Sequence, residues 1–334
     1  MSEHDNLPGP NGPLLDLPRV ETTAASTIPT TEYVRPCERI EPETKEFEGM
    51  PTLADRFATL THLLPLAGAP AMKSREGGEL ALTAHLRARA PWYSAAIDLL
   101  DQQWRLQLWL GKPWISFRPL LLVGPPGSGK SHLARMIAQR AQVGHSILSL
   151  AGVPDAMTME GNPRGFTNTM PCFPALTIAQ HGTANPIVVA EEVDKAGSSG
   201  RHGDPVSALL TLIEPSTARH YWDRCLLAPV NVSHVNWICT ANSIEMLSAP
   251  LRSRLDIVHV DGPAPEHFDI LLVNLLDEIA GQWQLPHALL PELAPEAEEL
   301  LRHRFARHRS VRRLERELKA AMAAGISAAP RSIS

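Results

Sequence analysis

One stretch of the sequence decides the fold: Gly124-Pro125-Pro126-Gly127-Ser128-Gly129-Lys130-Ser131. It follows an apolar run at 120–123, which predicts a buried strand, and it precedes a run at 132–138 with the apolar spacing of a helix. The spacing of its glycines, lysine and serine is that of a phosphate-binding loop between a strand and a helix. Glycine allows the backbone to wrap closely around a polyphosphate with its N–H groups pointing inward. We therefore predict that these eight residues bind a nucleotide.

Two side chains at the end of this loop can hold a nucleotide and its metal ion. Lys130 can reach the outer phosphates, and the hydroxyl of Ser131 can bind Mg²⁺. The helix predicted to begin near Lys130 adds the positive end of its dipole to the same anion site. A turn that only joined a strand to a helix would need neither this Lys-Ser pair nor three glycines.

The composition is that of a globular protein. The chain has 334 residues, of which 44% are hydrophobic and 20% charged, with a net charge of −5 that argues against a surface devoted to nucleic acid. The four cysteines form no C-x-x-C pair, so we expect reduced thiols. The acidic, polar N-terminus is no secretory signal, and no apolar run approaches the roughly 18 residues of a membrane helix. We expect a cytoplasmic protein without a membrane partner.

Changes in residue pattern divide the chain. Residues 1–50 are rich in Pro, Glu and Thr, which predicts a disordered tail. Residues 51–112 show helical periodicity and are predicted to form a helical N-terminal region. Over 113–262, short apolar runs alternate with helical segments, which predicts an α/β domain with a parallel sheet covered by helices on both faces. Residues 263–328 are predicted to be a small all-α domain, followed by a tail at 329–334.

Tryptophan is concentrated before the phosphate-binding loop. Four of the seven tryptophans lie between residues 92 and 114. This clustering favours a role in packing within the core or between subunits. Direct contact with the base of the nucleotide is the alternative.

Polar residues follow two of the later predicted strands. Glu191 and Glu192 come directly after the apolar run at 187–190. We predict that Glu191 holds Mg²⁺, directly or through water, and that Glu192 polarises the water that attacks the γ-phosphate. Asn242 closes the next run and can hydrogen-bond both that water and the phosphate. The alternatives are a solvated strand end for the acids and an ordinary turn residue for Asn242.

Two arginines precede the last predicted strand. Arg252 and Arg254 lie at the expected edge of the α/β domain. A guanidinium that reached the γ-phosphate of a neighbouring subunit would stabilise the charge of the transition state. Surface arginines are usually solvated, so this role depends on the formation of a ring.

Taken together, residues 119–325 resemble the ATPase module of the AAA+ family, most closely that of Lon proteases. The resemblance lies in Gly124–Ser131 (Walker A), 185–195 (Walker B), 204–210 and 239–242 (sensor 1). The segments at 185–195 and 204–210 are specific to Lon-type modules. The resemblance implies a P-loop fold with a helical lid that binds ATP and Mg²⁺. It also implies a homo-oligomer, a hexameric ring, that hydrolyses ATP and remodels or unfolds a client protein.

The resemblance also implies roles for single residues. Arg254 stands at the position of the arginine finger. Arg312 stands in the sensor 2 helix of the lid and would contact phosphate within its own chain. Phe166, within the segment 164–171, stands where the family has the aromatic residue of the pore loop that grips the client.

The sequence departs from the Lon pattern at several places. It ends at Ser334 without the peptidase domain, so we expect no peptide cleavage. Glu191 replaces the usual Asp, and its extra methylene moves the carboxylate by roughly 1.5 Å. Mg²⁺ requires near-ideal octahedral geometry, so we expect slow hydrolysis. Thr167-Asn168 replaces an apolar residue and a glycine, which weakens the expected grip on a client. The N-terminal region shows no clear likeness to the Lon substrate-binding domain.

Three functions agree with these observations. The first is an ATP-hydrolysing ring that remodels a protein partner and lacks peptidase activity. The second, motivated by Glu191, is a slowly hydrolysing, nucleotide-switched assembly or scaffold module. The third is a DNA-associated helper ATPase, suggested by the arginines and histidines at 302–313. The helical spacing of that cluster and its sensor 2 match favour a lid face instead, so nucleic acid is not the expected partner.

Overall fold

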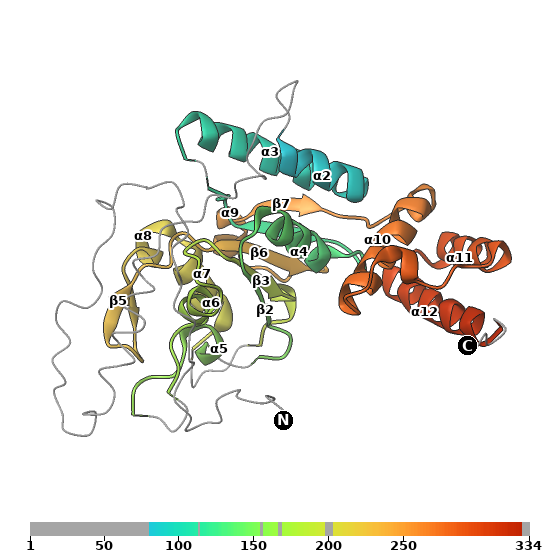
Figure 1. Cartoon of the computed structure of the whole chain (residues 1–334). Helices are drawn as coiled ribbons and strands as arrows, with labels where there is room; N and C mark the ends of the chain where they lie inside the picture. The colour runs from blue at the N-terminus through green and yellow to red at the C-terminus, as the bar shows by residue number, and fades with distance from the viewer. Residues whose placement is uncertain (1–79, 113, 154–155, 166–168, 198–202, 329–334) are drawn as a thin grey trace.

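The structure is a computed structural model, and it describes most of the chain from residue 80 onward (Figure 1). The described residues are 80–112, 114–153, 156–165, 169–197 and 203–328. The predicted tails at 1–50 and 329–334 and the first part of the predicted helical region lie outside them.

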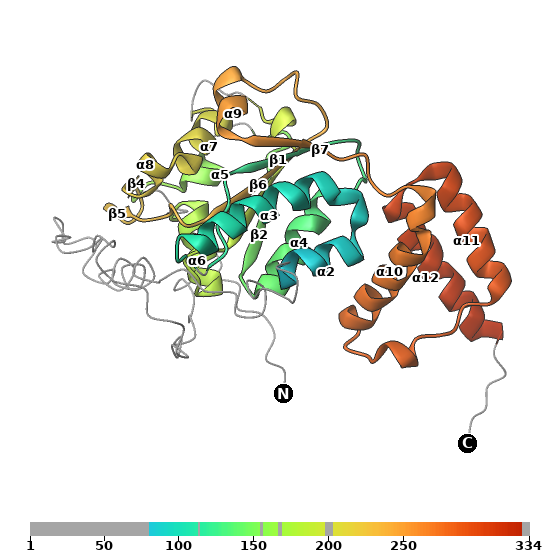
Figure 2. The same cartoon turned by 90° about the horizontal axis from the view of Figure 1, so that it is seen from above.

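A five-stranded parallel sheet forms the centre of the molecule (Figures 1 and 2). Its strand order is β2-β3-β6-β1-β7, so that β1, which leads into the phosphate-binding loop, lies between β6 and β7. The strands are β1 (Leu120–Val123), β2 (His145–Ser149), β3 (Ile187–Glu191), β6 (Asn236–Ala241) and β7 (Asp256–His259). The predicted parallel α/β sheet is confirmed.

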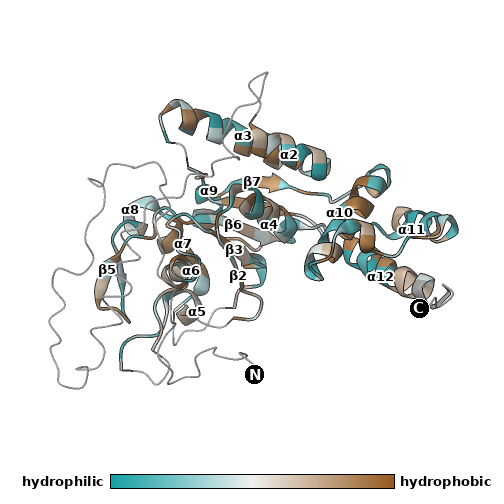
Figure 3. Cartoon of the chain, in the orientation of Figure 1, coloured by the Kyte–Doolittle hydropathy of each residue, from teal (hydrophilic) through white to brown (hydrophobic). Residues whose placement is uncertain are grey.

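The sheet is buried on both faces because alternate residues of its apolar strands point to opposite sides. In β1, Leu121 and Val123 belong to one hydrophobic core, and Leu120 and Leu122 belong to the other. Figure 3 shows the apolar character of β7 and α7 in brown. The first core contains side chains of α5 (Met157–Glu160), α6 (Phe173–His181), α7 (Pro205–Ile213), α8 (Pro215–Ala218) and α9 (Ala249–Arg254).

The second core is made with α2 (Ala81–Arg89), α3 (Ser94–Trp109) and α4 (Lys130–Ala141). Within it, Leu100 and Trp104 of α3 are buried together with Leu122 of the sheet and Ile137 of α4. The boundary predicted between residues 112 and 113 therefore does not separate two cores. Helices α2 and α3 share the core of the α/β domain, since without them this face of the sheet would be open to water.

A separate small core lies beyond the sheet. It joins α10 (Phe268–Gln282), α11 (Pro295–His308) and α12 (Val311–Ala328), which project from one side of the α/β domain in Figures 1 and 2. Phe268 and Leu275 of α10 meet Phe305 of α11 and Leu318 of α12 in this core. An all-α unit following the sheet was predicted and is confirmed. We call this three-helix unit the lid.

Short elements complete the described part of the chain. An antiparallel hairpin, separate from the central sheet, precedes β6. None of the helices that the structure describes is long and apolar enough to span a lipid bilayer. The hairpin strands are β4 (Tyr221–Asp223) and β5 (Ala228–Val230), and the 3₁₀ helices are η3 (Pro91–Tyr93), η4 (Val193–Lys195), η5 (Pro265–His267) and η6 (His287–Leu289).

Two tryptophans of α3 test whether this helix belongs to the core of the α/β domain. Trp104 is 0% exposed and Trp109 is 83% exposed. We expect Trp104→Ala to lower the free energy of unfolding by about 3–5 kcal/mol, because it leaves a cavity beneath the sheet. The matched change Trp109→Ala should alter it by no more than about 0.5 kcal/mol. Urea unfolding measures both values, and equal, small effects would contradict the shared core.

Candidate functional site

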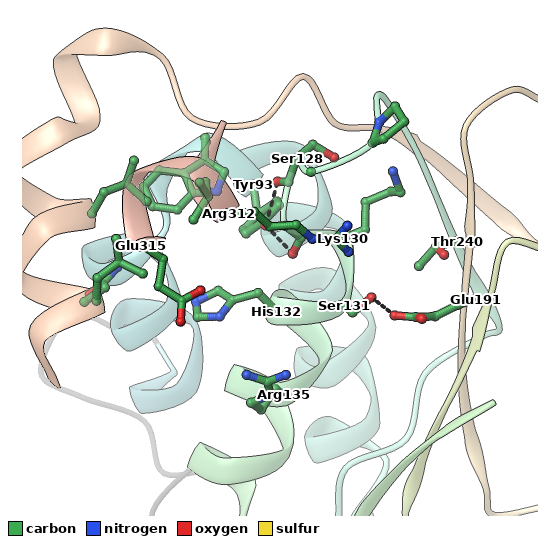
Figure 4. Close-up of a pocket in the computed structure, with 18 of the residues that line it drawn as sticks. Tyr93, Ser128, Lys130, Ser131, His132, Arg135, Glu191, Thr240, Arg312 and Glu315 are labelled. Atoms are coloured by element: carbon green, nitrogen blue, oxygen red, sulfur yellow. Dashed lines mark hydrogen bonds between the residues drawn. The ribbon is translucent and has the colours of Figure 1, made fainter. Parts of the chain in front are cut away.

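A pocket of about 270 Å³ lies at the carboxyl ends of the central strands (Figure 4). The phosphate-binding loop after β1 forms one wall, and the ends of β3 and β6 form the next. The lid and the short helix η3 close the remaining sides. Of the residues predicted for the site, its lining includes Pro126, Gly127, Ser128, Gly129, Lys130, Ser131, Glu191, Glu192, Asn242 and Arg312.

The loop fits against the sheet only because it contains glycine. A Cβ on Gly124 would lie 1.9 Å from the carbonyl oxygen of Val260, which follows β7. Gly127 has a φ of +82°, in the left-handed region that side chains disfavour. Any side chain at position 124 would therefore clash with the backbone after β7. At position 127 a side chain would be strained by the backbone conformation.

The ammonium group of Lys130 lies at the centre of the loop. Its Nζ donates to the carbonyls of Gly124 at 2.7 Å and Pro125 at 3.0 Å, and it lies 3.5 Å from Oδ1 of Asn242. Burial lowers the pKa of Lys130, and the nearby Asp194 carboxylate opposes this shift. A partly desolvated cation with only neutral acceptors in direct contact is well suited to meet a phosphate.

Ser131 and Glu191 form the candidate metal site. The Ser131 hydroxyl donates a hydrogen bond to the Glu191 carboxylate, which joins the start of α4 to the end of β3 (Figure 4). Hydroxyl and carboxylate oxygens are ligands that Mg²⁺ accepts, usually together with water and substrate phosphates. No group of three His, Cys, Asp or Glu side chains suited to a metal ion occurs within the described ranges. The two residues fit Mg²⁺ that arrives with a nucleotide.

Glu192 follows at the edge of the pocket in an unusual backbone conformation. Its φ of +57° is left-handed, and its N–H donates to Oγ1 of Thr240 at 3.2 Å. Its carboxylate accepts from Nζ of Lys195 at 2.7 Å, which raises the pKa of that lysine. Strained backbone of this kind is often found at functional sites. The contact with Thr240 fixes the strained turn to β6.

Asp194 connects the Glu192 turn to Asn242. One of its carboxylate oxygens accepts from the N–H groups of Asn242 at 2.9 Å and Ser243 at 3.3 Å. Asn242 thereby stands beside Lys130 at the pocket. No role of its own was predicted for Asp194 from the sequence. The available signal was that its carboxylate lies only two residues after Glu192, beside an acidic pair.

Arg312 reaches the pocket from α12 of the lid. Figure 4 shows its side chain beside the phosphate-binding loop. Besides burial, its positive charge contributes to the lowered pKa of Lys130. The structure thus brings together the loop and the cis arginine that the sequence predicted.

Arg254 lies away from this pocket. It ends α9 just before β7, and Asp256 at the start of β7 pairs with Leu120 at the start of β1. Because the strands are parallel, this is the end of the sheet opposite to the loop. Glu214 accepts from Nε of Arg254 at 3.0 Å. Arg254 therefore does not reach its own chain's pocket.

Phe166 lies outside the described residues. The described flanks of its segment pair through a bridge between Asn162 and Met170, and Nε of Arg164 donates to the carbonyl of Cys225 at 3.1 Å. The base of the segment therefore lies against the turn between β4 and β5.

Three contacts around the pocket were not predicted from the sequence. Trp92 lines the pocket and packs against both the α/β core and the lid core; packing was predicted for the tryptophan cluster, but this place between the two cores was not. Tyr93 contacts the phosphate-binding loop directly. Nδ1 of His132 lies 3.0 Å from Glu278 of α10, and this contact lowers the pKa of Glu278. No spacing in the sequence relates these residues to the loop, because each contact depends on how the lid and η3 pack.

Comparison with known proteins defines the class. Residues 120–260 match the family model described as "ATPase family associated with various cellular activities (AAA)". The chain therefore contains an AAA ATPase domain, in agreement with the parallel sheet and the P-loop.

Curated relatives place this domain next to Lon proteases. The chain is 34% identical over 197 residues to "Lon protease homolog, mitochondrial" of Caenorhabditis elegans, covering 59% of this chain and 20% of that protein. It is 34% identical over 200 residues to "Lon protease" of Desulfovibrio desulfuricans, covering 60% and 22%. "Lon protease homolog 2, peroxisomal" of Spinacia oleracea is 34% identical over 214 residues, covering 63% and 24%. The chain thus spans about a quarter or less of these relatives, and the domain is related to the Lon ATPase module.

Replacement of Lys130 tests whether the loop binds a nucleotide. Lys130→Met keeps the length of the side chain and removes the charge. We expect it to weaken binding of ADP with Mg²⁺ by roughly 10- to 100-fold, as for loss of a charged hydrogen bond. Isothermal titration calorimetry measures the change, with the exposed Lys112→Met as control. Equal affinities for both variants would contradict a phosphate site at Lys130.

Proposed function

We propose that this protein is an ATPase that binds ATP with Mg²⁺ in the pocket, hydrolyses it, and uses the cycle to remodel or unfold a protein partner. The observation that carries the proposal is the meeting of Lys130, Ser131 and Glu191 with Asn242 at the carboxyl ends of the strands. These residues come from three separate segments. Their convergence on an AAA ATPase fold supports nucleotide chemistry over a purely structural loop.

In ATP hydrolysis each residue of the pocket would have a separate role. The loop amides and Lys130 would hold the β- and γ-phosphates, and Ser131 and Glu191 would hold Mg²⁺. When bound, the ion would neutralise part of the phosphate charge. Glu192 would polarise the attacking water, and Asn242 would orient that water toward the γ-phosphate. Arg312 would join the phosphate site when the lid is closed.

The position of Arg254 supports a ring. It lies at the opposite end of the sheet from its own pocket, so its partly exposed guanidinium, paired with Glu214, could reach a nucleotide only in another subunit. We therefore include a homo-oligomer, a hexameric ring, in the proposal. In it Arg254 stabilises transition-state charge in the neighbouring pocket.

The client is proposed to be a polypeptide, because the related proteins are named proteases. Phe166 would contact it. Peptide cleavage is not part of the proposal, which concerns the ATPase domain alone. The cytoplasmic location expected from the composition and the cysteines belongs to the proposal as well, and the three cysteines that the structure describes are free.

The ion pairs on the lid surface do not favour nucleic acid as a partner. Arg302 pairs with Asp269 and Glu298, and Arg313 pairs with Glu317. These contacts neutralise part of the basic cluster that suggested DNA binding.

A second candidate function is a slow, nucleotide-switched assembly module. The direct contact between Ser131 and Glu191 favours it, because the longer acid reaches the hydroxyl that a metal ion needs. Both residues would then have to separate before Mg²⁺ could bind between them. If nucleotide binds tightly and is hydrolysed slowly, the nucleotide-bound state itself would control assembly, and repeated hydrolysis would not be needed.

Replacement of Glu192 tests the ATPase proposal. Glu192→Gln keeps the shape of the side chain and removes the base, so turnover should fall by about 100-fold or more. Affinity for ATP should stay within about threefold, since the loop and lid contacts remain. A coupled phosphate-release assay and calorimetry measure the two quantities, with Glu299→Gln on the exposed surface of α11 as control. Equal residual turnover in the wild-type protein and Glu192→Gln would reject hydrolysis at this site.

Replacement of Glu191 separates the two candidate functions. If the natural protein is a slowed switch, Glu191→Asp should raise turnover about tenfold, or about 1.4 kcal/mol of barrier, by making room for the metal ion beside Ser131. The matched change Glu192→Asp should lower turnover, because it withdraws the base. An increase supports a slowed switch in the natural protein. No increase would contradict the switch and support the working motor.

A further inference from the structure

Tyr93 makes an unexpected contact with the phosphate-binding loop. Its side chain comes from η3, before α3, and is only 2% exposed. The hydroxyl lies 2.5 Å from the carbonyl oxygen of Gly129 and 3.1 Å from that of Ser128 (Figure 4). Burial raises the pKa of Tyr93, so the hydroxyl stays protonated and donates a hydrogen bond to the loop.

Because peptide bonds are planar, this contact also fixes N–H groups on the opposite side of the loop. In a trans peptide, the C=O of one residue and the N–H of the next point in opposite directions. Holding the carbonyls of Ser128 and Gly129 therefore also holds the N–H groups of Gly129 and Lys130. In the described part of the chain, neither of these N–H groups has a hydrogen-bond partner. They are free to donate to an anion in the pocket.

The backbone of the loop is shaped to fit the tyrosine. Gly129 is the N-cap of α4 with a φ of +85°, and a Cβ there would lie 2.4 Å from the Tyr93 hydroxyl. The tyrosine ring is held in turn, because it is buried in the core shared by α3 and the sheet. The hydroxyl is thus a rigid anchor, placed by a segment that precedes the loop by more than thirty residues.

We propose that Tyr93 is a positioning residue for the phosphates of the nucleotide, acting through the amides of Gly129 and Lys130. The proposal rests on nucleotide binding in this pocket, as in the proposed function. The buried hydroxyl would keep the N–H groups of these two peptides directed toward the phosphate site before a nucleotide binds. The Gly129 carbonyl also accepts from the N–H groups of His132 at 2.9 Å and Leu133 at 3.3 Å, so its plane stays partly held without the hydroxyl. The Ser128–Gly129 plane depends on the hydroxyl more strongly, and without it binding must order that plane.

The test compares two tyrosine-to-phenylalanine variants of the full chain. Tyr93→Phe removes the hydroxyl that contacts the loop, and Tyr221→Phe removes that of another buried tyrosine, in β4, away from the pocket. We expect Tyr93→Phe to weaken binding of ADP with Mg²⁺ about tenfold. We also expect faster hydrogen exchange, in the absence of nucleotide, of the hydrogen-bonded loop amides of Ser128, His132 and Leu133, which donate to carbonyls of Pro125 and Gly129. Tyr221→Phe should change neither quantity, whatever its effect on the thermal midpoint.

Each outcome decides the matter. Affinity within twofold of the wild-type protein, with unchanged exchange of the loop amides, would overturn the proposal. A Tyr93→Phe chain that is unfolded at 25 °C would overturn it too, because a general structural role would then explain the residue. If the wild-type protein binds no nucleotide, the proposed function fails. Exchange of the loop amides then still decides whether Tyr93 holds them.

Discussion

The structure depends on one constraint: the loop between β1 and α4 must leave the N–H groups of Gly129 and Lys130 unpaired while its carbonyls are satisfied by the protein. Lys130 donates to the carbonyls of Gly124 and Pro125, and Tyr93 donates to those of Ser128 and Gly129. Both ends of the loop are thereby fixed from the carbonyl side. The pocket side is left with donors and a partly desolvated cation, which is the arrangement that binds phosphate most readily.

The order of the strands explains why the other groups meet this loop. β1 lies between β7 and β6, and β6 lies beside β3, so the ends of β3 and β6 stand on one side of the loop. Parallel strands put these carboxyl ends at the same edge. Contacts across the edge, from Ser131 to Glu191 and from Asp194 to Asn242, then tie the strand ends together. The amino ends, where Arg254 lies, face a different part of the surface.

The sequence predicted what depends on local pattern. The strand–loop–helix motif, the acids at 191 and 192, Asn242 and the helical lid could be read from spacing, because each follows an apolar run directly. Tyr93, Trp92 and the His132–Glu278 contact could not. They depend on the packing of η3 and the lid against the loop, which no periodicity encodes. The boundary drawn at residue 112 likewise followed the change in pattern, whereas burial joins α3 to the sheet.

We propose that the pocket performs ATP hydrolysis and is completed by Arg254 of a second subunit. Sedimentation velocity with and without ATP, combined with turnover measured on the same samples over a range of protein concentrations, tests it most directly. We expect ATP to promote assembly and turnover per chain to rise with the assembled fraction. A monomer that hydrolyses ATP at a constant rate per chain at every concentration would contradict it.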